Sequence, residues 1–150
     1  MEKIKRTLSY LKNRFGIPEE VFDDYMLIEQ KDVWVASKEA AGFPIRAFSR
    51  RGIRLARIFP RGVKFTTAGM QVFGKYATRN IVRLHNEDEL ERYLRGEDIN
   101  VGEIEGVQEG QVIVKWNDDI LGSAVYRDGK LKNQLPKGRR IVGARKKARK

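Results

Sequence analysis

Short β-rich runs alternate with turn-forming residues from Val63 to Leu135, and this pattern limits the possible fold more than any other feature of the sequence. The pair Asp128-Gly129 is a strong hairpin signal, because both residues tolerate the positive φ that a tight turn requires. Two amphipathic segments interrupt the strands, one capped by Thr66 or Thr67 and the other by Asn86. The second half therefore predicts a mainly β unit with flanking helices, in a Greek-key-like or pseudo-barrel arrangement.

The first half predicts a smaller α+β unit. Apolar residues from Ile4 to Phe15 recur at helical spacing, and Gly16 is a typical helix stop. Four β-rich runs follow, at 25–29, 33–36, 45–49 and 53–59. Pro60-Arg61-Gly62 breaks the pattern, so we place the domain boundary there. Residues 1–60 then form the N-terminal unit, 61–143 the mainly β domain, with a last strand at 140–142, and 144–150 a basic tail.

Charge is sorted along the chain. Residues 38–83 hold eleven Lys or Arg and one acid, residues 84–109 hold two basic and nine acidic residues, and residues 137–150 hold eight basic residues and no acid. Basic residues clustered in this way, with a formal net charge of +11, are typical of proteins that bind a phosphate backbone. A soluble protein with a charged tail is the simpler explanation, and the clustering favours nucleic-acid binding over it.

Composition excludes several kinds of site. Cysteine is absent and His85 is the one histidine, so no disulfide, thiolate nucleophile or zinc cluster can form from this sequence. No apolar run is long enough to span a bilayer, and the charged N-terminus does not have the pattern of a signal peptide, so we expect a cytoplasmic protein. Adjacent acids such as Asp118 and Asp119 lie at expected turns, where solubility explains them better than metal-dependent hydrolysis. We expect no cofactor and no bound metal.

Two strings of the second half resemble a known RNA-binding domain. They run from Phe65 to Leu84 (FTTAGMQVFGKYATRNIVRL) and from Gly122 to Arg139 (GSAVYRDGKLKNQLPKGR). In this order they resemble the PUA-like domain of RNA cytosine-5 methyltransferases of the Nop/Sun/Fmu type, over about residues 63–142. Over its whole length the chain resembles small archaeal ribosome-biogenesis proteins related to that family. The resemblance implies a PUA fold, a mixed pseudo-barrel with flanking helices that binds structured RNA.

The resemblance does not extend to the catalytic part of those methyltransferases. They attack the pyrimidine ring with cysteine, and this chain has none. It also has no glycine-rich unit for a methyl donor. We therefore expect an RNA-binding module that is not itself an enzyme.

Candidate RNA contacts are basic or hydroxyl-bearing residues near the resembling strings, together with one aromatic. In PUA-type domains the first helix, the following strand and the last strand face the RNA. Thr67 is placed to donate to phosphate or simply to cap the helix, and Tyr126 is the aromatic that we expect to be exposed for stacking. Lys75 and Arg79 would share a helix face if the helix continues to Arg79. The predicted contacts are Lys64, Thr67, Lys75, Arg79, Arg83, Tyr126, Arg127, Lys130, Lys132, Lys137, Arg139 and Arg140, with an extension to Arg50, Arg51 and Arg54.

These residues support two functions. The first is non-catalytic binding of structured RNA, either rRNA or tRNA, in ribosome biogenesis or RNA modification, through a basic groove and tail. The second is an accessory subunit that docks an RNA methyltransferase or another RNA-modifying enzyme, using the acidic helix at 87–95 and the N-terminal unit. The expected partners are therefore RNA together with an RNA-modifying enzyme or a pre-ribosomal particle. An RNA-processing enzyme would need a cluster of titratable residues that the sequence does not provide.

Overall fold

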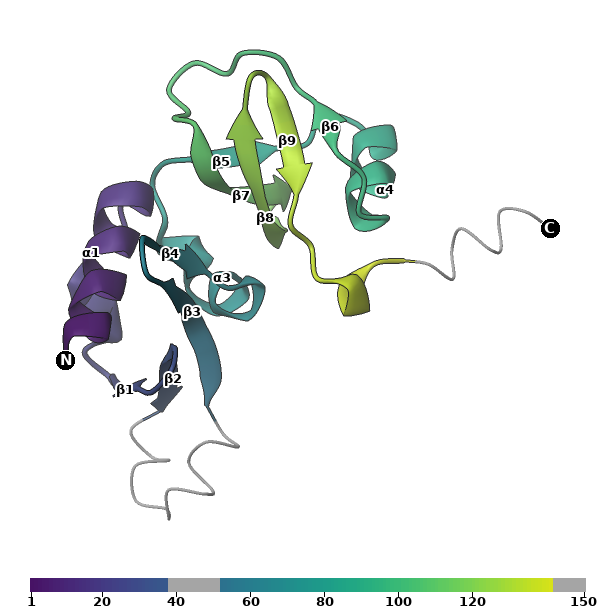
Figure 1. The fold of residues 1–150 in the computed structure, drawn as a ribbon. Coiled ribbons are helices and arrows are strands. Elements are labelled where there is room, and N and C mark those ends of the chain that lie inside the picture. Colours follow the sequence, from purple (N-terminus) through teal and green to yellow (C-terminus); the bar gives the residue numbers. More distant parts are fainter. Residues whose placement is uncertain (38–51, 142–150) are drawn as a thin grey trace. The chain divides into compact units, whose positions relative to one another are not determined.

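The chain forms two compact units, Met1–Arg79 and Asn80–Lys150. The computed structural model describes residues 1–37 and 52–141 of them (Figure 1). Both units combine helices with a sheet, so the predicted α+β class is confirmed. The boundary differs from the expected one, because Pro60 and Arg61 form the turn between two paired strands and Gly62 begins the second of them. A Pro/Gly break in sequence marks hairpin turns and domain linkers alike.

Unit 1 is an antiparallel sheet with helices packed on it. Its strands lie in the order β1 (Tyr25–Glu29), β2 (Val33–Ser37), β3 (Ile53–Phe59) and β4 (Gly62–Phe65). The helices are α1 (Glu2–Phe15) and α3 (Thr67–Phe73), with 3₁₀ turns at Glu19–Phe22 and Gly74–Tyr76. Tilted ring pairs fill the core, with the ring centre of Phe15 5.6 Å from that of Phe65 and Phe22 4.8 Å from Phe73.

The C-terminal end of α1 is hydrogen-bonded to the last residues of unit 1. Gly16 adopts a left-handed φ of 72°, and its N–H donates to the Lys12 carbonyl. The Phe15 carbonyl accepts from the Thr78 N–H at 2.7 Å. A side chain at Gly16 would collide with the Thr78 hydroxyl, so both the turn and this close approach require glycine.

Unit 2 is a curled, mixed sheet with a helix against one side (Figure 1). The strand order is β5 (Ile81–Arg83), β7 (Gly110–Trp116), β8 (Asp119–Arg127), β9 (Lys130–Asn133) and β6 (Ile99–Asn100). β5 and β7 are parallel and the other pairs are antiparallel. Helix α4 (Glu87–Leu94) contributes Tyr93, which packs with Val112, Ala124 and Leu131 in the core of this unit.

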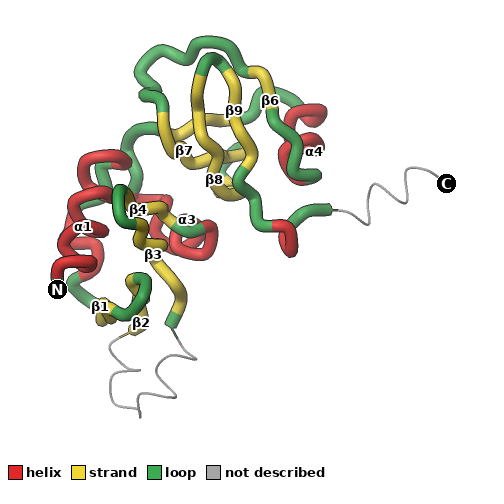
Figure 2. Tube along the Cα trace, in the orientation of Figure 1, coloured by secondary structure: helices red, strands yellow, loops and turns green. Residues whose placement is uncertain are grey.

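Local signals in the sequence located most of these elements. Asp128 and Gly129 have φ of 53° and 76° in the β8–β9 turn, as the hairpin signal predicts. The last strand predicted at 140–142 is wrong: a 3₁₀ turn lies at Lys137–Arg139, and Arg140 and Ile141 are not in a strand. The short strand β6 was not predicted. It is followed by a long irregular loop before β7 (Figure 2).

No helix of the described residues is both long and apolar enough to cross a membrane.

Candidate nucleic-acid interface

The predicted contact residues fall in both units. Unit 1 carries the ones from Lys64 to Arg79 together with Arg54, and unit 2 carries those from Arg83 to Arg140. Arg50, Arg51 and the basic tail at 144–150 lie outside the described residues. One groove lined by all of these residues stays a prediction.

The β8–β9 hairpin brings three of the predicted cations onto one face. Arg127 and Lys130 are directly opposite each other, and Lys132 is opposite Val125. Residues that are directly opposite, and those two apart on one strand, point to the same side of a sheet. All three cations are exposed, and none forms an ion pair with another described residue. They form a row of positive charge on an ordered strand pair.

Tyr126 does not belong to this exposed row, and its predicted exposure is wrong. It is only 5 % exposed, on the buried side of β8 with Ala124 and opposite Leu131. Its hydroxyl donates to the Gly102 carbonyl at 2.9 Å and accepts from the Ile104 N–H at 2.8 Å. Tyr126 therefore anchors the loop between β6 and β7, and it cannot act as a stacking platform in this conformation.

The residues after β9 divide into exposed and structural ones. Lys137 and Arg139 are exposed on the 3₁₀ turn. Arg140 is half-buried, and its Nε donates to the Leu135 carbonyl at 3.0 Å. Its guanidinium lies so close to Gly96 that a side chain there would collide with it. Arg140 therefore fastens the end of the described chain to the end of α4, and this contact competes with any role in phosphate binding.

Arg83 has a basic neighbour that sequence reasoning missed. Parallel pairing of β5 and β7 places Arg83 beside Lys115. Arg83 is exposed and Lys115 is half-buried. Lys115 lies between Val114 and Trp116, and the alternation of apolar and polar residues in this strand was the signal for an outward-facing cation.

In unit 1, three of the predicted contact residues are buried or paired with other residues of the unit. Thr66, not Thr67, caps α3 by accepting from the Gly69 N–H at 2.9 Å, whereas Thr67 is the first helical residue and is buried. Arg79 donates to the Lys12 carbonyl at 2.9 Å, at the end of α1. Arg54 pairs with Asp32 at 3.5 Å. These roles explain the residues without RNA.

The shared helix face expected for Lys75 and Arg79 does not exist. α3 ends at Phe73, and a single 3₁₀ turn, Gly74–Tyr76, follows it. Lys75 is exposed, with its ammonium 5.3 Å from the centre of the Tyr76 ring. Gly74 occurs where the α-helix gives way to this turn, and glycine weakens a helix interior.

Lys64 lies on β4 directly opposite Arg57 of β3. It is half-buried, and burial, followed by the nearby Arg57 charge, lowers the pKa of its ammonium. Two cations directly opposite each other in a sheet repel, so this position favours an anion.

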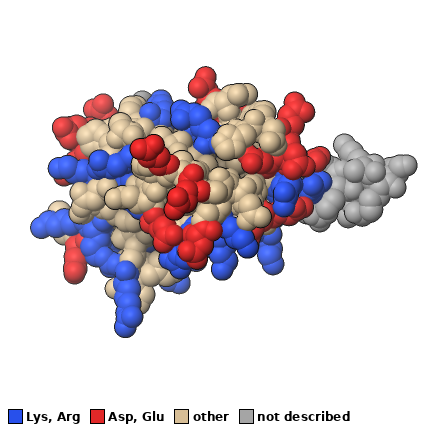
Figure 3. Space-filling model, turned by 90° about the horizontal axis from the view of Figure 1, so that it is seen from above, with Lys and Arg blue, Asp and Glu red and all other residues tan. Residues whose placement is uncertain are grey.

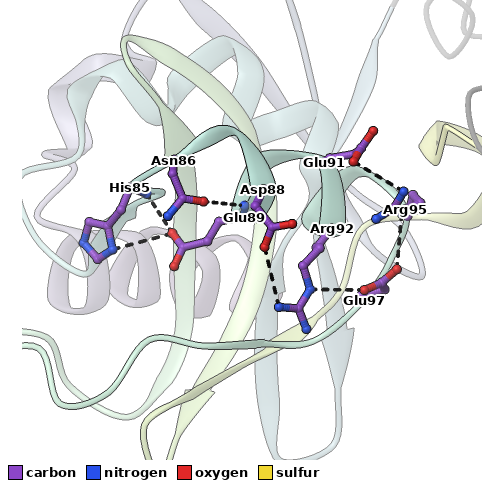
Figure 4. Close-up of polar contacts among 8 residues, drawn as sticks. All are labelled: His85, Asn86, Asp88, Glu89, Glu91, Arg92, Arg95 and Glu97. Atoms are coloured by element: carbon purple, nitrogen blue, oxygen red, sulfur yellow. Dashed lines mark hydrogen bonds and ion pairs between the residues drawn. The ribbon is translucent and has the colours of Figure 1, made fainter.

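The acids of α4 are largely matched by arginines of the same segment. Arg92 pairs with Asp88 at 3.9 Å and Glu97 at 3.2 Å, and Arg95 pairs with Glu91 at 3.5 Å and Glu97 at 3.2 Å (Figure 4). These exposed pairs each contribute little to stability, yet they reduce the field that the acids present to a partner.

A second acidic region surrounds a hollow in unit 2. The loop between β6 and β7 and the β8–β9 turn line an open hollow of about 880 Å³, to which Glu103, Glu105, Glu109 and Asp128 contribute carboxylates. Figure 3 looks down on this loop and shows acidic side chains gathered there. The lining holds no Lys or Arg among the described residues, so the hollow repels phosphate. In the described ranges, no three acidic or histidine side chains converge as a metal site would require.

Comparison with known proteins assigns a family likeness to unit 2. Residues 79–141 match the family model described as the methyltransferase RsmF PUA domain. The matched segment starts one residue before unit 2, and the curled mixed sheet with its helix is consistent with a PUA-like domain.

Several curated relatives are bacterial ribosomal RNA small subunit methyltransferases F. The Vibrio atlanticus protein is 30 % identical over an alignment of 122 residues, which covers 76 % of this chain and 25 % of the relative. The Shewanella oneidensis protein is 27 % identical over 137 residues, 91 % of this chain and 28 % of the relative. The chain thus spans about a quarter of the length of these relatives. The expected archaeal connection is not borne out by these relatives, which are bacterial. The likeness extends beyond unit 2 into unit 1.

Proposed function

We propose that this chain binds structured ribosomal RNA of the small subunit in the context of rRNA modification. The observation that carries the proposal is the row of Arg127, Lys130 and Lys132 on one face of the β8–β9 hairpin, inside the segment that matches an RsmF PUA domain. Three exposed cations on an ordered strand pair fit the spaced phosphates of an RNA backbone. The names of the relatives, which are ribosomal RNA methyltransferases, direct the choice of RNA.

The role that we propose for this chain is non-catalytic. The resembling methyltransferases use a cysteine nucleophile, and the chain has no cysteine. Its likeness to the relatives covers about a quarter of their length. We therefore assign recognition of RNA to this chain and methyl transfer to another polypeptide segment.

The experiment is a titration of a fluorescent stem-loop from small-subunit rRNA at a series of salt concentrations. We expect affinity to fall steeply with salt, because each phosphate contact releases condensed counterions on binding. A decrease of less than about threefold between 50 and 200 mM salt would contradict a mechanism with several phosphate contacts. A DNA hairpin of the same sequence is the control, and weaker binding to it supports contacts with the 2′-hydroxyl.

The second candidate function is docking of an RNA-modifying enzyme. The acids of α4 support it less than their number in the sequence suggests. Asp88, Glu91 and Glu97 already pair with arginines of the same segment. A partner protein that is recovered with the chain after nuclease treatment, together with absence of RNA binding in the titration, would favour this function instead.

A further inference from the structure

One face of the β3–β4 hairpin in unit 1 combines an exposed aromatic ring with two cations. Arg57 and Phe59 are two residues apart on β3, and Lys64 is directly opposite Arg57 on β4. These three side chains therefore project from the same side of the hairpin. The Arg57 guanidinium carbon lies 5.8 Å from the centre of the Phe59 ring. Phe59 is 44 % exposed, which is unusual for a phenylalanine within a strand.

The cations of this face lack a negative partner in the described part of the chain. Neither Arg57 nor Lys64 forms an ion pair there. Like charges directly opposite each other in a sheet are destabilising, and burial together with the Arg57 charge lowers the pKa of Lys64. An anion bound between them would remove the repulsion.

The hairpin is held in place by a helix of the same unit. The Arg6 guanidinium of α1 donates to the Phe59 carbonyl at 2.7 Å and to the Gly62 carbonyl at 3.2 Å. The ring and the two cations are thus fixed to backbone that a helix supports, and less entropy is lost when a ligand binds.

We propose that this face binds an unpaired nucleotide of RNA, with its base stacked on Phe59 and an adjacent phosphate held by Arg57 and Lys64. The inference rests on the proposed function and adds a second contact that is separate from the β8–β9 cations. Phenylalanine has no hydrogen-bonding group, so the contact tolerates any base.

A single strand is the nucleic acid that this chemistry fits. In a duplex the base faces are stacked on one another and inaccessible to a side chain, whereas loops and single-stranded ends splay their bases outward. Unpaired RNA also repeats a phosphate beside each base, which matches a ring flanked by cations.

The test compares two RNAs, a stem-loop and the same stem-loop with a short single-stranded extension that carries a fluorescent base analogue. We expect the extension to tighten binding and its fluorescence to be quenched on binding. Phe59→Ala should weaken the affinity for the extended RNA by at least about fivefold, the lower end of what stacking one base contributes. It should leave the affinity for the stem-loop unchanged. Phe59→Trp, which keeps an aromatic ring at this position, should retain the quenching that Phe59→Ala loses.

Met26→Ala is the matched control, because Met26 is an apolar residue with a similar exposure of 37 %. It lies on β1, at the edge of the sheet opposite β4. Met26→Ala should change neither affinity. Equal affinities of wild type and Phe59→Ala for the extended RNA would overturn the inference while leaving the proposed function intact. Failure of wild type to bind either RNA would overturn the proposed function itself.

Discussion

Both units bury aromatic rings in their cores, but unit 1 also exposes two rings beside cations. In unit 2, Tyr93 and Tyr126 are buried, and their hydroxyls donate to backbone carbonyls. In unit 1, the rings of Phe59 and Tyr76 are exposed by 44 % and 43 %, with cations 5.8 Å and 5.3 Å from the ring centres. Burial makes a ring part of the scaffold, whereas an exposed ring beside a cation is accessible to a ligand that has both a flat face and a negative charge.

If the chain binds RNA as proposed, this difference gives the two units different kinds of contact. Unit 2 presents cations from a sheet whose β6–β7 loop is held by the Tyr126 hydroxyl. Such an arrangement suits phosphate contacts that do not depend on base identity. Unit 1 adds rings and so suits contacts with bases. Removing a buried ring, a row of charges and a single ammonium in turn tests this difference between the units.

The largest effect is expected from the scaffold ring Tyr93. It is fully buried in the core of unit 2, and burial raises the pKa of its hydroxyl far above the ordinary value. Tyr93→Ala should lower the free energy of unfolding by about 3–5 kcal/mol, as other large-to-small aromatic replacements in cores do. Urea denaturation measures the decrease.

Two further variants test whether the loss of stability in Tyr93→Ala is caused by the loss of a buried ring. Tyr93→Phe removes only the hydrogen bond to the Ser123 carbonyl, which also accepts from the Gln134 N–H, so we expect a decrease of about 1 kcal/mol. Phe59→Ala removes an exposed ring and should cost less than about 1 kcal/mol. A cost for Phe59→Ala as large as that for Tyr93→Ala would mean that Phe59 is a structural residue and would break the comparison.

The next effect concerns the cations of the β8–β9 hairpin. Replacing Arg127, Lys130 and Lys132 together by Ala should lower the log–log slope of RNA affinity against salt by about one for each phosphate that the variant no longer binds. The affinity for a stem-loop should fall together with the slope, while fluorescence quenching of a single-stranded extension should persist. Titrations over several salt concentrations measure both quantities.

The matched control removes the same net charge elsewhere. Lys5, Lys12 and Lys31 are exposed lysines of unit 1, outside the predicted contact set. Their replacement by Ala should change the slope by less than about one, because none of them is expected to bind a phosphate directly. If both triple variants lower the slope equally, net charge rather than the hairpin row controls affinity.

Local signals in the sequence were sufficient to locate most of the fold. Gly16 ends α1 and Asn86 caps α4 by accepting from the Glu89 N–H, because these positions depend on one residue and its near neighbours. The failures depend on distant partners. β6 has only two residues and exists because Ile99 pairs with Leu131, far along the chain, so no periodicity could show it.

The sequence indicates which cations are exposed better than it indicates which side chains have structural partners. Alternation along β8 and β9 correctly places Arg127 and Lys132 on the exposed face, and the same alternation should have placed Tyr126 on the buried one. The hydrogen bonds that Arg79 and Arg140 donate to backbone carbonyls depend on the folded chain, and nothing in the sequence indicates them. Phe59 is not among the contacts predicted from the sequence, because a phenylalanine at the end of a strand normally belongs to a core.

The smallest effect concerns the protonation of Lys64. Burial, followed by the charge of Arg57, lowers the pKa of Lys64 in the folded protein, so this ammonium loses its proton at lower pH than an ordinary lysine. In the pH window between the lowered pKa and the ordinary one, the unfolded chain binds more protons than the folded chain, so Lys64 makes stability rise with pH there.

RNA affinity should change in the opposite direction, because the phosphate contact needs the charged form of Lys64. We expect the affinity for the extended RNA to fall a few-fold as pH rises through this window, and Lys64→Arg to remove the fall, because arginine keeps its charge. Titrations with the two RNAs at increasing pH measure the effect. An identical fall in wild type and Lys64→Arg would show that the RNA titrates instead and that Lys64 does not hold a phosphate.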